Sequence, residues 1–221
     1  MSSQHIVSYD TWSFICRAIV HNNIEKFKEL GEVKEMLEHV SVEHGREYLE
    51  DLLKEGISID LIEEVSELND TNGAEIINYH GISVSPSTLR YLRHAVDISN
   101  LIESKKFNGA VNLVEVGGGY GALCLILNFI LEKQGIEVNN YHIIDLEPVS
   151  NLQKHYLKGK LENAYFHDSS NFGADVEEDN LILISNYCLG EIAIDTRKKY
   201  LEILLPKMML KMPKRISNVR I

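Results

Sequence analysis

The sequence predicts an α/β protein whose second half forms a doubly wound parallel sheet. From about residue 110 onward, short apolar runs alternate with longer helix-like segments, and this alternation requires crossover connections between parallel strands. The runs lack polar alternation, as expected of strands that are covered on both faces. The first hundred residues show helical spacing of apolar side chains instead.

The N-terminal region, residues 1–105, is expected to be all-helical. Apolar side chains recur at helical spacing in four segments, which are 11–30, 42–56, 60–68 and 85–104. Ser85 is a suitable N-cap and Pro86 suits the first helical position. The sequence NDTNG (69–73) has turn chemistry, and a loop through Gly81 precedes the last of these helices.

The second region, residues 106–221, contains the predicted sheet. Its four strand candidates are VNLVEV (111–116), YHIIDL (141–146), NAYFHD (163–168) and LILISN (181–186). Longer helix candidates separate them, so the strands are expected to lie parallel. The change of pattern places the boundary between the regions near residues 105–110.

Composition limits the partners of the chain. Its 221 residues include 22 Lys and Arg against 33 Asp and Glu, a formal net charge of -11. Such a surface repels nucleic acid and anionic lipid, so neither is an expected partner. The N-terminus lacks the pattern of a secretory signal, and the three cysteines are far apart in apolar surroundings. We expect a cytoplasmic protein with reduced thiols and no metal site, whose oligomeric state is open.

The sequence VNLVEVGGGYGALCLI (111–126) concentrates four glycines between two apolar runs. In open α/β folds, ligands bind beyond the carboxyl ends of the strands, where the first strand turns into its helix. Gly117, Gly119 and Ala122 satisfy the pattern G-x-G-x-x-G/A of dinucleotide-binding proteins. A lone match of this kind does not identify the ligand, and a tight turn without any ligand is the simplest alternative.

Glu115, just before the glycines, favours one ligand over another. A carboxylate beside the helix N-terminus would repel a diphosphate, whereas it attracts the ammonium group of S-adenosylmethionine. Asp145 ends the second strand, where an acid can accept hydrogen bonds from both ribose hydroxyls; it could also be an ordinary helix cap. After the third strand, Asp168 or Ser169 would reach the adenine amino group, unless that segment is a plain loop. Asn186 ends the fourth strand, as a ligand contact or as a turn residue.

Four segments together resemble the sugar O-methyltransferase family of bacteria and large DNA viruses. They are SPSTLRYLRHA (85–95), LVEVGGGYGALCLI (113–126), YHIIDLEPVSNLQKHYL (141–157) and LILISNYCLGEI (181–192). The resemblance extends from about residue 69 to residue 205. It implies a Rossmann-like class I methyltransferase that uses S-adenosylmethionine to methylate a sugar hydroxyl, on a small-molecule or glycan acceptor. The cofactor-binding residues predicted here are Glu115, Gly117, Gly119, Tyr120, Gly121, Asp145, Asp168, Ser169 and Asn186.

Two side chains are candidates for the general base that would remove the hydroxyl proton. His94 lies four residues after Arg90 on one predicted helix, and the family has a histidine at the matching place. Glu191 follows the fourth strand, and the sequence favours its alternative role as a helix-terminal acid stabilised by the dipole. Arg90 and Tyr91 are candidates for binding the acceptor, and packing against the sheet is the alternative.

The end of the chain differs from the family pattern. A complete methyltransferase sheet has seven strands, whereas only KMMLKMPKRISNVRI follows Pro206. The resemblance therefore implies a C-terminally truncated sheet, with RISNVRI (215–221) as a candidate edge strand. Two other functions stay open from the sequence: a nicotinamide-dependent oxidoreductase, and an inactive homologue that acts as a binding or assembly partner.

Overall fold

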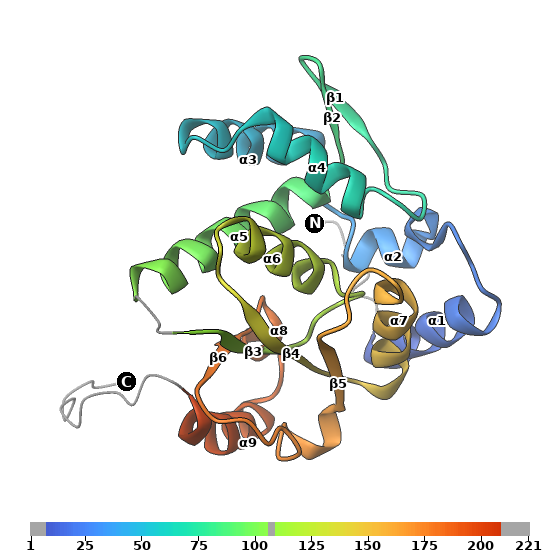
Figure 1. Cartoon of the computed structure of the whole chain (residues 1–221). Helices are drawn as coiled ribbons and strands as arrows, with labels where there is room; N and C mark the ends of the chain where they lie inside the picture. The colour runs from blue at the N-terminus through green and yellow to red at the C-terminus, as the bar shows by residue number, and fades with distance from the viewer. Residues whose placement is uncertain (1–7, 106–108, 209–221) are drawn as a thin grey trace.

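The computed structural model describes residues 8–105 and 109–208, and Figure 1 shows how their helices and strands are arranged. In the first of these ranges the elements are α1 (Tyr9–His21), α2 (Gly31–Met36), α3 (Val42–Lys54), α4 (Ile59–Asn69), β1 (Ile77–Tyr79), β2 (Ile82–Val84) and α5 (Pro86–Ser104). Serine side chains cap α1, α3 and α4 by accepting a hydrogen bond from a backbone N–H three residues on. Helix α5 begins at the predicted proline.

The prediction of an all-helical N-terminal region is wrong at residues 77–84. Strands β1 and β2 pair antiparallel there as a hairpin (Figure 1). Gly81 has φ +104° in the turn between them, a value that glycine adopts without strain. The strands are three residues long, too short for their alternation of side chains to stand out in the sequence.

The predicted helix over 11–30 is also shorter than expected. Helix α1 ends at His21, where the Asn22 side chain donates a hydrogen bond to the Ala18 carbonyl. Asn23 then adopts φ 48°, which turns the chain. The remaining residues form a 3₁₀ turn, Phe27–Glu29, before α2.

All four predicted strands are present in the second range. They are β3 (Val111–Val116), β4 (Val138–Asp145), β5 (Ala164–Asp168) and β6 (Leu181–Ile184), all parallel and in the order β5-β4-β3-β6. The helices between and after them are α6 (Ala122–Lys133), α7 (Glu147–Leu157), α8 (Cys188–Glu191) and α9 (Ile194–Leu204). The chain therefore has a mixed α/β fold with a four-stranded parallel sheet in the part that the structure describes.

Helices cover both faces of this sheet. On one face, Leu113 and Ile143 belong to a large core with α5, α6 and α7. On the other, Val114 and Ile144 pack with Leu204 of α9. Alternate strand residues thus enter different cores, which explains the continuous apolar runs in the sequence.

The larger core also includes side chains from before residue 105. Trp12, Leu49 and Leu92 belong to the same cluster as Ile126 and Ile143. Helix α1 packs against α7, and α5 packs against α6. The two predicted regions therefore share one core, and a division into two domains near residue 105 stays a prediction.

The C-terminal expectation falls mostly outside the described residues. Met208 forms an isolated parallel bridge with Leu181, beside β6. The candidate edge strand at 215–221 lies beyond the described range, which ends at residue 208.

Candidate functional site

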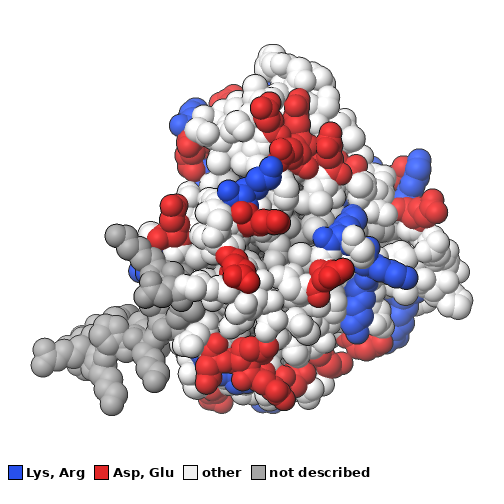
Figure 2. All heavy atoms as spheres, viewed as in Figure 1, with Lys and Arg blue, Asp and Glu red and all other residues white. Residues whose placement is uncertain are grey.

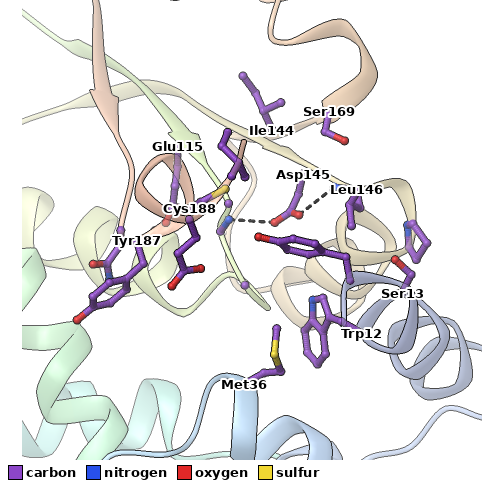
Figure 3. A pocket seen from close by; sticks show the side chains of 18 of the residues that line it. Trp12, Ser13, Met36, Glu115, Ile144, Asp145, Leu146, Ser169, Tyr187 and Cys188 are labelled. Carbon is purple, nitrogen blue, oxygen red and sulfur yellow. Dashed lines mark hydrogen bonds between the residues drawn. The ribbon is translucent and has the colours of Figure 1, made fainter. Parts of the chain in front are cut away.

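A cavity of about 1190 Å³ lies at the carboxyl ends of β3, β4 and β5 and beside the segment that follows β6. From β3 the chain continues to β4 and β5 on one side of the sheet and then crosses over to β6 on the other side of β3, so the strand order reverses at β3. In open α/β sheets, ligands bind at such a point of reversal. The fold therefore places the cavity where its topology favours a ligand (Figure 3).

The glycine turn forms the floor of this cavity, through Gly117, Gly118 and Gly119. Gly117 has φ +80°, and a Cβ added there would lie 2.4 Å from the Cβ of Cys188. Both its backbone conformation and its contact with α8 thus require glycine. Gly121 also has positive φ, but it packs against Leu157 and does not line the cavity.

Glu115 lies at the end of β3 and lines the cavity with only 1% of its surface exposed. Its carboxylate accepts a hydrogen bond of 2.9 Å from the hydroxyl of Tyr141. Burial raises the pKa of Glu115 to about 8, more than the hydrogen bond from Tyr141 lowers it. No Lys, Arg or His among the described residues forms an ion pair with this carboxylate.

Asp145 at the end of β4 also lines the cavity, and its carboxylate is already held by protein groups. One oxygen accepts hydrogen bonds from the Gly118 N–H and the Gln153 amide, each at 3.0 Å. The other accepts one from the Leu146 N–H at 2.8 Å (Figure 3). Burial raises its pKa to about 6, although these hydrogen bonds favour the charged form. The sequence had suggested either a helix cap or a ribose acceptor; Asp145 does not cap α7, whose N-cap residue is Leu146 and has no side-chain cap, and its role toward a ribose stays a prediction.

Four further predicted residues line the same cavity: Asp168, Ser169, Asn186 and Glu191. Asp168 accepts a hydrogen bond of 2.7 Å from the N–H of Ser170, and hydrogen bonds with Ser170 lower its pKa. Glu191 ends α8 with an exposed side chain. The predicted acids and polar groups that follow all four strands are therefore brought together.

Besides Gly121, two of the predicted site residues do not line the cavity. Tyr120 is 1% exposed, and its hydroxyl donates to the Glu38 carboxylate at 2.6 Å, so its side chain belongs to the core. His94 does not line the cavity, and its Nε2 is buried without a hydrogen-bond partner among the described residues. Burial and then the nearby Arg90 charge lower the pKa of His94, which disfavours its protonated form. The structure therefore favours Glu191 over His94 on position alone.

Arg90 and Tyr91, the predicted acceptor-binding pair, both line the cavity. Arg90 is 6% exposed and donates a hydrogen bond of 2.8 Å to the carbonyl of Leu37. Its guanidinium also lies over the ring of Tyr91, at 4.9 Å from the centroid. Arg90 thus both contacts the C-terminal end of α2 and lines the cavity.

The sequence did not indicate that α1 and α2 form a wall of the cavity. Trp12 and Ser13 of α1 and Met36 of α2 line it on the side opposite the strand ends (Figure 3). Tyr187 and Cys188, after β6, line it as well, and Tyr187 has φ 74°, an unfavourable value for a residue with a side chain. No local pattern marks these residues, because their place depends on how α1 packs on α7.

Within the described ranges, no group of three or more His, Cys, Asp or Glu side chains is arranged to hold a metal ion. None of the helices described there is long and apolar enough to cross a membrane. The face of the molecule in Figure 2 carries several clusters of acidic side chains with basic ones between them.

Comparison with known proteins gives only distant similarity. No protein-family profile matches the chain, and no curated protein matches its sequence. One similar solved structure is the plantazolicin methyltransferase BpumL in complex with SAH, with 17% identity and a TM-score of 0.39 over 80% of this chain. Another is an uncharacterized protein from Burkholderia thailandensis, with 15% identity and a TM-score of 0.31 over 83% of this chain. The chain spans 58% and 42%, respectively, of the lengths of those two proteins.

Proposed function

We propose that this protein is an S-adenosylmethionine-dependent methyltransferase. The observation that supports it most directly is Glu115, a carboxylate that is 1% exposed and lines the cavity beside the glycine turn without a cationic partner among the described residues. Burial disfavours the ionised form of this carboxyl group, whose pKa it raises to about 8, unless a counter-charge compensates it. The ammonium group of S-adenosylmethionine would supply that counter-charge.

The charge of the cavity also separates this cofactor from a dinucleotide. Glu115 and Asp145 adjoin the turn that would hold a diphosphate, and Glu147, Asp168 and Glu191 line the same cavity. Like charges repel, and this repulsion is strong where water is excluded. A cofactor with a positive sulfonium and no phosphate fits these side chains better than a nicotinamide dinucleotide does.

Residues at the ends of successive strands are the candidate partners of successive parts of the cofactor. Glu115 would hold the ammonium, Asp145 the ribose hydroxyls, and Asp168 or Ser169 the adenine amino group. Gly117 and Gly119 would allow the backbone to approach the methionyl and ribose parts. Protein groups occupy three of the roughly four acceptor sites of the Asp145 carboxylate, which leaves capacity on its Oδ1 for one ribose hydroxyl.

The bound cofactor would supply an activated methyl group, and the protein would position an acceptor hydroxyl in line with it. Glu191 is the candidate base for the hydroxyl proton, since it lines the cavity and His94 does not. The acceptor is proposed to be a sugar hydroxyl on a small molecule or glycan, on the family resemblance of the sequence. A cytoplasmic location, where the cofactor is made, accords with this proposal.

Titration calorimetry with S-adenosylhomocysteine (SAH) and with NAD⁺ tests the proposal. We expect SAH to bind and NAD⁺ not to bind, because the acidic cavity rejects the diphosphate. Tight binding of NAD⁺, or no binding of SAH, would refute it. Transfer of a labelled methyl group to a panel of glycans then separates an active enzyme from a homologue that only binds the cofactor.

A further inference from the structure

Arg90 carries a buried charge in the wall of the cavity. It is 6% exposed, and none of the described carboxylates lies within ion-pair distance of it. Its Nη2 donates to the Leu37 carbonyl at 2.8 Å, its Nη1 lies 3.4 Å from His39 Nε2, and its Nε has no partner in the described structure. Burial lowers the pKa of Arg90, but Tyr91 and the more distant Glu38 carboxylate raise it more, so Arg90 stays charged with none of the described carboxylates in direct contact.

The neighbouring Arg93 on the same helix provides a comparison, because carboxylates compensate its charge. Arg93 lies three residues along α5 and does not line the cavity. Its guanidinium forms ion pairs with Glu55, at 2.6 Å, and with Asp97. The more exposed arginine therefore has two carboxylate partners, whereas the more buried one has none among the described residues.

Arg90 and Glu115 thus present a buried cation and a buried carboxyl group to one cavity, and they are not paired with each other. Burial raises the pKa of Tyr91, next to Arg90 in the chain, to about 12, although the Arg90 charge lowers it. Tyr91 therefore stays a neutral hydroxyl and neutralises neither group. A ligand that carries both an ammonium and a carboxylate would compensate the two residues together.

We propose that Arg90 binds the α-carboxylate of the amino-acid end of the cofactor, while Glu115 binds its α-ammonium. This inference rests on the proposed function and deepens it, because it moves Arg90 from the acceptor to the cofactor. A guanidinium is suited to this task, since its N–H groups match the geometry of a carboxylate. The contact with Leu37 holds Arg90 in place and leaves other N–H groups of its fork for the ligand.

The test compares two ligands that differ only in the carboxylate. SAH and its decarboxylated analogue are titrated into the wild type, into Arg90→Gln and, as a matched control, into Arg93→Gln. Loss of a charged hydrogen-bond pair corresponds to roughly a 10- to 100-fold loss of affinity. We expect Arg90→Gln to lose about that factor for SAH and less than about 3-fold for the analogue, and Arg93→Gln to change neither.

Equal losses for the two ligands in Arg90→Gln would overturn the inference, because they would show that Arg90 acts only by holding α2. An unchanged affinity for SAH would overturn it as well. Failure of SAH to bind the wild type is a different result, since it refutes the proposed function itself. If Arg90→Gln does not fold, Arg90→Lys keeps the charge without the fork, and the same selective loss for SAH is the criterion.

Discussion

The carboxylate of Asp145, at the end of β4, accepts a hydrogen bond of 3.0 Å from the backbone N–H of Gly118, in the turn after β3. Its other oxygen accepts one from the Leu146 N–H, which begins the connection to α7. One side chain thus joins the turns that follow two neighbouring parallel strands. The shape of the cavity floor depends on this acid before any ligand arrives.

We expect Asp145→Ala to lower both stability and cofactor affinity. The change leaves the Gly118 N–H and the Gln153 amide without their acceptor, which costs about 1–3 kcal/mol of unfolding free energy. SAH affinity should fall at least ~10-fold, as expected for the loss of a charged hydrogen bond. Urea denaturation and calorimetry measure the two effects. Asp195→Ala, on the exposed side of α9, is the control, and an SAH affinity equal to that of the control would contradict the role of Asp145.

The raised pKa of Glu115 makes the unfolding free energy depend on pH. Burial moves this pKa from 4.5 to about 8, so the folded protein keeps a proton that the unfolded chain has released. This group stabilises the fold fully below about pH 4.5, and its contribution is lost as pH rises through about 8. The unfolding free energy of Glu115→Gln should therefore fall less with rising pH over that window than that of the wild type.

Ligand binding is coupled to the loss of the same proton from Glu115. An ammonium favours the ionised carboxylate, so SAH binding should release a proton, and affinity should rise by up to ~10-fold per pH unit as pH approaches about 8. Calorimetry in buffers of different ionisation enthalpy counts that proton. In Glu115→Gln the dependence should disappear. A wild-type affinity that does not change with pH would show that Glu115 does not meet a cation.

The sheet was predictable from the sequence because its signals are local. Each strand is a short apolar run that ends in a polar residue, and the run keeps that character because both faces are covered. The Ser85–Pro86 start of α5 follows from backbone preferences of those residues alone. Glu115 and Asp145 were found for the same reason, since strand ends at one edge of a parallel sheet lie close together.

The rest of the site depends on contacts between distant segments. Trp12 and Met36 line the cavity because of how α1 and α2 pack on other elements. No local sequence pattern predicts that packing. Tyr120 lies among the glycines in sequence, yet its side chain turns into the core and reaches Glu38. His94 shares a helix with Arg90 but does not reach the cavity. Sequence spacing therefore located the backbone of the site better than it located the side chains.

Gly117→Ala should destabilise the protein in two separable ways. The residue has φ +80°, which costs about 1–3 kcal/mol for a residue with a Cβ. The new Cβ would also overlap the Cβ of Cys188 at 2.4 Å. Adding Cys188→Gly should recover the second effect only, as measured by urea denaturation. Gly31→Ala is the control, because nothing lies within 4 Å of its added Cβ and its φ is ordinary; equal stability of the two alanine variants would contradict the steric argument.

Asp70 has a structural role, although it lies within the range over which the sequence resembles the methyltransferase family. Its carboxylate accepts hydrogen bonds from the N–H of Ser85 and the hydroxyl of Ser66, each at 2.7 Å, and from the hydroxyl of Thr88. It thereby ties the end of α4 to the start of α5, and the segments NDTNG and SPSTLRY meet through it. None of these groups lines the cavity, although Arg90 on the same helix does.

Asp70→Ala should therefore reduce stability without altering the site. The change leaves the Ser85 N–H and the Thr88 hydroxyl without this acceptor, whereas the Ser66 hydroxyl keeps the Ser83 carbonyl, which predicts a loss of about 2–5 kcal/mol of unfolding free energy. At a temperature where the variant stays folded, its SAH affinity should remain within about 2-fold of the wild type, because α5 still presents Arg90. Asp179→Ala, at an exposed bend, controls for removal of one carboxylate. A large loss of SAH affinity in folded Asp70→Ala would mean that this network positions the cavity wall as well as the helix.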